Sequence, residues 1–137
     1  MVKDIVKDQK SLMLKSELAN SDDLYILDDL IDTLDANREH CVGMAANMIG
    51  YNKCILVYIN KNEKIEYMIN PTIIKCEDEY LVKEGCLSLE GQRETKRYKK
   101  IKVEYYNNKF QKRIKTFNGF TAEIIQHEID QLNGIII

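Results

Sequence analysis

The spacing of apolar residues changes along the chain from helical to strand-like and back to helical, and few folds accommodate that order. In the first helical stretch, apolar residues recur at intervals of three and four: Leu24, Leu27, Ile31 and Leu34. Ser21-Asp22-Asp23 precedes them as an N-cap with an acidic first turn. The pattern predicts a helix from about residue 22 to 38.

Strand patterns dominate the middle of the chain. They cover 53–59, 64–70, 72–82 (a weaker signal), 100–106 and 110–117. Asn60-Lys61-Asn62 joins the first two segments, Asn70-Pro71 ends the second, and Asn107-Asn108 joins the last two. We therefore expect two hairpins.

A second helix closes the chain. Thr121 opens it, Asn133-Gly134 ends it, and its apolar stripe is Ala122, Ile125, Ile129 and Leu132. We expect this stripe to be buried against the sheet, with Ile124, Glu128 and Gln131 facing a cleft. The fold class is α+β: mostly antiparallel sheets packed around the C-terminal helix, with an N-terminal helix.

Length and composition indicate one folded domain, 1–137. The chain has 45% hydrophobic and 31% charged residues, typical of a globular protein. It has no run of about 18 apolar residues, and charges interrupt every apolar stretch near Met1. We expect a cytoplasmic protein without a membrane partner, whose four cysteines are free thiols. The sequence leaves the oligomeric state open.

Residues 93–115 are locally basic. Ten cationic residues occur there: Arg93, Lys96, Arg97, Lys99, Lys100, Lys102, Lys109, Lys112, Arg113 and Lys115. Lys100 and Lys102 alternate with Ile101 and Val103, which is typical of the solvated face of a strand. An RNA surface or ribosome contact is the alternative interpretation.

Two short segments could carry chemistry. His127-Glu128-Ile129-Asp130-Gln131 differs from the helical metal motif H-E-x-x-H only at its last position, where Gln131 replaces a histidine. Glu84-Gly85-Cys86-Leu87-Ser88 places a cysteine between strand-like segments. Cys86 is either an exposed thiolate ligand or a small buried residue.

Three motifs together resemble those of the peptide deformylase family, in the family's order and along nearly the whole chain. The segment around Gly43-Met44-Ala45-Ala46-Asn47-Met48 resembles G-x-G-x-A-A-x-Q, and Glu84 to Ser88 matches E-G-C-L-S at every position. His127 to Gln131 resembles H-E-x-D-H. The resemblance implies the peptide deformylase fold.

The same resemblance implies a metallohydrolase that removes the formyl group from the N-terminal formylmethionine of nascent polypeptides. Fe(II) is the usual metal of the family, with Zn(II) or Ni(II) as alternatives. By position, Cys86 and His127 are metal ligands, Glu128 is the acid/base, and the backbone N–H of Leu87 is an oxyanion donor. The residues that line the substrate site are Gly43, Met44, Met48, Glu123 and Ile124.

Three departures from the family motifs bear on activity. Cys41 replaces the first glycine of the first motif, Met48 replaces its glutamine, and Gln131 replaces the second histidine ligand. Loss of one oxyanion donor typically costs about 100- to 1000-fold in rate. An amide oxygen at Gln131 can coordinate a metal but is less basic than imidazole. His40 or Cys41 is the alternative third ligand.

Two hypotheses follow. In the first, Cys86, His127 and Glu128 form a working centre, with Gln131 or a substitute as the third ligand, and the chain is an active enzyme. In the second, Met48 and Gln131 have removed catalysis, and a degenerate deformylase-like cleft binds N-terminal peptides without turnover.

Overall fold

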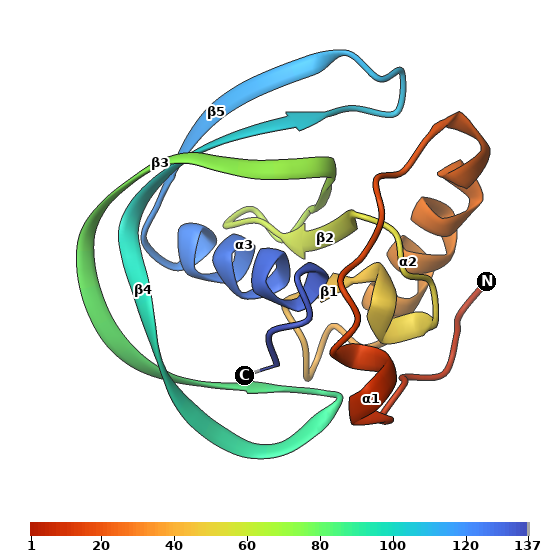
Figure 1. Cartoon of the computed structure of the whole chain (residues 1–137), viewed down its shortest axis with the longest axis horizontal. Coiled ribbons are helices and arrows are strands. Elements are labelled where there is room, and N and C mark those ends of the chain that lie inside the picture. Colours follow the sequence, from red (N-terminus) through yellow and green to blue (C-terminus); the bar gives the residue numbers. More distant parts are fainter. Residues whose placement is uncertain (137) are drawn as a thin grey trace.

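The computed structural model describes residues 1–136, in which five strands form one antiparallel sheet in the order β1-β2-β3-β4-β5 (Figure 1). The strands are β1 (Gly43–Ala45), β2 (Ile55–Ile59), β3 (Ile65–Cys86), β4 (Leu89–Tyr106) and β5 (Lys112–Asn118). The helices are α1 (Gln9–Leu12), α2 (Leu24–Ala36) and α3 (Gly119–Leu132), with the 3-10 turns η1 (Ser21–Asp23) and η2 (Ala46–Ile49). This arrangement confirms the α+β class.

The predicted N-terminal helix is confirmed as α2, but its cap differs. A separate 3-10 turn, η1, precedes it, and Asn20 rather than Ser21 supplies the cap. The Asn20 side chain accepts from Asp22 N at 2.9 Å, and Asp23 accepts from Asn20 N at 2.9 Å. This reciprocal pairing satisfies amides that a helix start leaves unpaired.

The two longest strands were underestimated from the sequence. β3 runs past Pro71 without a break, and β4 begins at Leu89 rather than near residue 100. Pro71 lies where the register with β4 shifts, so its missing N–H removes no ladder hydrogen bond. Near the turn that joins β3 and β4, both strands are rich in charged residues and lack apolar alternation. There, residues of opposite charge are register partners, such as Lys83 on β3 and Glu94 on β4.

The long β3–β4 hairpin bends around α3, so that one continuous sheet encloses the helix where several sheets were expected (Figure 1). The predicted stripe of α3 is buried, as expected: Ala122, Ile125, Ile129 and Leu132. The helix is also buried on its other faces, and it begins at Gly119 rather than Thr121. Gln131, expected in a cleft, has no exposed surface.

The core has two parts, which lie on opposite faces of β2. Ile55 and Val57 pack in the part that α2 covers, whereas Leu56 and Tyr58 pack in the part that α3 covers. This alternation follows from the two-residue period of a strand. The predicted hairpin about Asn107 is confirmed, and β5 forms a basic edge of the sheet.

Candidate metal centre

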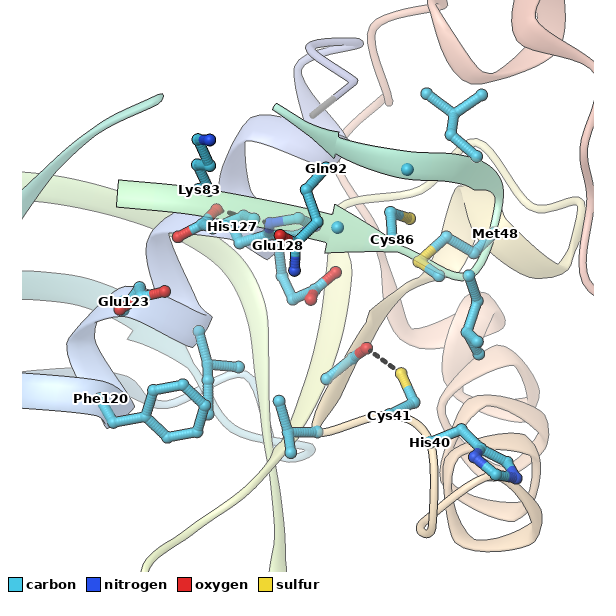
Figure 2. A pocket seen from close by; sticks show the side chains of 18 residues that line it. His40, Cys41, Met48, Lys83, Cys86, Gln92, Phe120, Glu123, His127 and Glu128 are labelled. Carbon is cyan, nitrogen blue, oxygen red and sulfur yellow. Dashed lines mark hydrogen bonds and ion pairs between the residues drawn. The ribbon is translucent and has the colours of Figure 1, made fainter. Parts of the chain in front are cut away.

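A cavity of about 620 Å³ lies between α3, the β3–β4 turn and the segment that leads into β1. Figure 2 shows Cys86, His127 and Glu128 together on one side of it. Most predicted site residues line it: Gly43, Met48, Cys86, Leu87, Glu123, Ile124, His127 and Glu128. Met44 and Gln131 do not: the Met44 side chain points to the opposite face of β1 and is buried in the core beside α2, and Gln131 is fully buried.

Cys86 and His127 come together because β3 ends against the middle of α3. Both residues line the cavity. The backbone N–H of Ser88, in the turn, donates to Cys86 Sγ at 3.4 Å. Cysteine binds metals as its thiolate.

Gln131 follows His127 by one helical turn and presents its amide to the same place. Its Oε1 lies 3.9 Å from Cys86 Sγ, and its Nε2 is buried without a partner among the described residues. A sulfur and an oxygen bound to one tetrahedral metal are about 3.6 Å apart, from the usual bond lengths. Cys86 Sγ and Gln131 Oε1 are therefore spaced about as two ligands of one metal ion would be.

Glu84 orients His127. Its Oε1 lies 2.8 Å from His127 Nδ1, so that an Nδ1–H donated to Glu84 leaves Nε2 free to bind a metal. Burial acts to lower the pKa of His127, but hydrogen bonds with Cys86 and Glu84 outweigh burial and raise that pKa to about 10. With that pKa, both ring nitrogens of His127 carry a proton at neutral pH. A metal that binds Nε2 must therefore displace the Nε2 proton.

Arg97 holds Glu84 in turn. Its guanidinium lies 2.7 Å from Glu84 Oε1 and 2.7 Å from Asp130 Oδ2, so it joins β3, β4 and α3. Burial acts to raise the pKa of Glu84, but hydrogen bonds from His127 and Arg97 outweigh burial and lower it to about 2. Glu84 is thus a fixed anion behind His127.

The role of Glu84 was missed at the sequence level, although a signal was present. Glu84 and Cys86 are two residues apart on one strand, so their side chains share a face. Once Cys86 is a candidate ligand, the carboxylate on the same face is the natural partner for a ligating histidine. Arg97, the cation that pairs with Glu84, lies on β4. No pattern in the sequence around Arg97 indicates that pairing.

Glu128 is buried next to the cavity, and its Oε1 has no partner among the described residues. Burial raises the pKa of Glu128 to about 7. The carboxylate packs on Gly43, where an added Cβ would lie 2.7 Å from Ile124 Cγ2 and 2.9 Å from Glu128 Oε2. Position 43 therefore requires glycine to leave room for Glu128.

The alternative third ligands, His40 and Cys41, line the cavity but do not join the centre (Figure 2). Cys41 Sγ donates to the carbonyl oxygen of Gly43 at 2.9 Å, and burial raises the pKa of Cys41 to about 12. Within residues 1–136, no three His, Cys, Asp or Glu side chains lie close enough to share a metal ion. This arrangement favours Gln131 as the third donor.

A cysteine and a helical His-Glu pair that line one cavity, with a buried amide one turn further along the helix, are typical of the metal-dependent hydrolase class. Similarity to known proteins assigns the chain to one family within this class. The polypeptide deformylase family profile matches residues 2–137. A peptide deformylase of Clostridium beijerinckii is 57% identical over 137 residues and covers 100% of both chains. Peptide deformylase 2 of Clostridium acetobutylicum is 43% identical over 81% of this chain and 73% of its own.

Solved structures agree with these sequence matches. The class I type b peptide deformylase from Acinetobacter baumannii with Met-Ala-Ser bound is 27% identical, with a TM-score of 0.86 over 99% of this chain and 96% of its own. The peptide deformylase of Thermotoga maritima is 26% identical, with a TM-score of 0.87 over 99% of this chain and 95% of its own.

The chain belongs to the peptide deformylase family. These enzymes are metal-dependent hydrolases that remove the formyl group from nascent formylmethionyl polypeptides, and a divalent metal fits the donors described above. The family match favours the enzyme over the degenerate binding cleft. Among the described residues, none of the helices has the length and apolar character needed to cross a membrane.

Proposed function

We propose that this chain deformylates N-formylmethionyl peptides, with Cys86, His127 and Gln131 holding a divalent metal and Glu128 transferring the proton. The observation that carries the proposal is that Cys86, His127 and the buried Glu128 line one cavity, with Gln131 Oε1 3.9 Å from Cys86 Sγ. The cavity supplies room for the substrate, and Gly43, Met48, Glu123 and Ile124 line its wall.

A bound divalent metal would act as a Lewis acid and lower the pKa of water. Water adds to the formyl carbon, the carbon–nitrogen bond breaks, and formate and a free amino terminus result. Glu128 accepts the proton from water and delivers it to the departing nitrogen. The Leu87 N–H donates to the developing oxyanion, while Glu84 and Arg97 keep His127 oriented.

Fe(II) is the proposed metal, with Zn(II) and Ni(II) as the alternatives to be tested. Thiolate and imidazole ligands suit all three metals, whereas a neutral amide ligand weakens retention of each. Metal analysis of protein purified without oxygen identifies the resident ion. We expect substoichiometric occupancy that EDTA removes readily, together with loss of activity on chelation.

The decisive experiment follows release of the free amine from formyl-Met-Ala-Ser. Glu128→Gln should abolish turnover and keep the metal, because Glu128 moves the proton and is not a ligand. Cys86→Ala should lose the metal itself. Glu90→Gln, at the exposed start of β4, is the matched carboxylate control and should change neither. Full turnover by the Glu128 variant would refute the assignment.

We also propose that residues 93–115 contact ribosomal RNA, which places the enzyme with nascent chains in the cytoplasm. Lys100 and Lys102 are exposed on β4, and Lys102 is the register partner of exposed Lys75 on β3, so cations of both strands gather on this surface. Lys100→Glu with Lys102→Glu should weaken ribosome binding and reduce its salt dependence. Lys61→Glu with Lys64→Glu, on the β2–β3 turn, is the control, and equal loss in both pairs would exclude this surface.

A further inference from the structure

Asn47, in η2, makes a contact that links the first motif to the last turn of α3. Its side chain is 2% exposed, and Nδ2 donates to the backbone carbonyl of Gln131 at 2.8 Å and reaches the carbonyl of Leu12 at 3.5 Å. Both neighbours are carbonyl oxygens, which only accept hydrogen bonds, so Nδ2 must face them. The cost of the arrangement is an Asn47 Oδ1 without a partner among the described residues.

Gln131 depends on this support because it lies at a helix end. The last four carbonyls of a helix have no partner within the helix. The Gln131 carbonyl accepts from Gly134 N at 3.1 Å and from Asn47 Nδ2. The next carbonyl, of Leu132, accepts from Ser16 N at 2.8 Å. Segments far away in the sequence therefore fix the turn that carries Gln131.

The side chain of Gln131 has little else to orient it. Oε1 faces Cys86 at 3.9 Å and Nε2 has no partner among the described residues. An uncharged amide also binds a metal more weakly than imidazole, so it depends more on correct placement. A shift of the Gln131 backbone would carry Oε1 away from Cys86 without opposition from any other side-chain hydrogen bond.

We infer that Asn47 is a positioning residue for the third metal ligand: its amide fixes the Gln131 backbone and thereby holds Oε1 at the centre. The inference rests on the proposed function, because it takes Gln131 as a ligand. It assigns a role to a residue of the first motif whose side chain lies outside the cavity. Without Asn47, the amide ligand would sample positions away from Cys86.

The test uses Co(II) as the probe, because its visible absorption reports ligand number and geometry. Asn47→Ala should weaken Co(II) binding about tenfold, at the lower end of the effect of residues that orient ligands, and should shift the absorption bands. Asn133→Ala is the matched control. Asn133 Nδ2 also donates to a carbonyl of the last turn of α3, that of Ile129, at 3.1 Å. The control should lower the melting temperature and leave the Co(II) spectrum unchanged.

Two further variants separate the possible outcomes. Asn47→Ser keeps a polar group but is one atom too short to reach Gln131, so it repeats the test if the alanine variant folds poorly. Gln131→Ala should weaken Co(II) binding at least as much. Unchanged binding in Gln131→Ala would refute the proposed ligand set. Weakened binding there, with an unchanged spectrum in both Asn47 variants, would overturn the positioning role alone.

Discussion

Individual residues decide how strongly this centre holds a metal and how fast it turns over. Gln131 provides a neutral oxygen where the family motif has imidazole, and Met48 provides a thioether where the motif has an amide donor. Met48 lines the cavity with 1% of its surface exposed, and its Sδ lies 3.5 Å from Ala45 N. In the proposed mechanism, the first substitution acts on metal binding and the second on the stability of the transition state.

Gln131→His should tighten metal binding, because imidazole is the more basic ligand and the new side chain starts one turn after His127. Competition with a chromophoric chelator measures the change in dissociation constant. Gln131→Asn, which keeps an amide but shortens the side chain, is the control and should bind more weakly. An unchanged constant in the histidine variant would contradict the assignment of Gln131.

Met48→Gln should raise kcat and leave metal content unchanged. The amide supplies a donor to the developing oxyanion, and such donors contribute up to about 100- to 1000-fold. Met48→Leu has no donor and a similar volume, so it should match the native enzyme. Steady-state kinetics on formyl-Met-Ala-Ser, with metal analysis of the same samples, checks both expectations. A gain that appears only in KM would contradict the oxyanion explanation.

Of the helices and strands, α3 supplies the most residues to the proposed centre, and most of its side chains are buried. It contributes His127, Glu128 and Gln131 to the centre, and the bent β3–β4 hairpin encloses it (Figure 1). Arg97 ties that hairpin to the helix through Glu84 and Asp130. The positions of His127, Glu128 and Gln131 therefore depend on how α3 packs against the hairpin as well as on the sequence of α3.

Ile129→Ala should lower the free energy of unfolding by about 2 to 5 kcal/mol, since Ile129 is 8% exposed and packs in the core beside the sheet. Ile114→Ala on β5 removes the same atoms from a side chain that is 51% exposed, and should change stability by less than about 0.5 kcal/mol. Urea denaturation of both variants gives the comparison. Equal effects would mean that the helix is rotated from the described orientation.

At the scale of the whole molecule, hydrogen bonds and close packing join the N-terminal segment to the end of α3. Ser16 donates to Leu132, and Asn47 contacts both Leu12 and Gln131. Gly134 lies against Met13, where an added Cβ would be 2.8 Å from the carbonyl carbon. The end of α3 that carries Gln131 is therefore held by contacts with segments far away in the chain.

Gly134→Ala should destabilise the fold by more than Gly91→Ala. Both glycines have φ +78°, which costs a residue with a side chain about 1 to 2 kcal/mol, but the added Cβ at position 91 meets nothing within 4 Å. The difference between the two melting temperatures therefore measures the contact with Met13. Equal losses would show that this contact tolerates a methyl group.

Local patterns in the sequence determined the element types, the buried stripe of α3, and Cys86, His127 and Glu128 as candidates. Each depends on residue type and spacing over a few positions, where helix and strand periods apply. The full length of β3 and β4 was not predictable in the same way. Their charged halves are stabilised by pairs across the two strands, which no single stretch of sequence displays.

Only the tertiary structure decided which residues complete the centre. Glu84 and Arg97 behind His127, Asn47 behind Gln131, and the exclusion of Met44 from the cavity all depend on which segments pack together. The low polarity of the interior makes each such pairing strong when it is formed and costly when it is left open. Residue spacing along the chain is therefore enough to identify the candidate ligands. The residues that hold those ligands in place are identified only by the packing of distant segments.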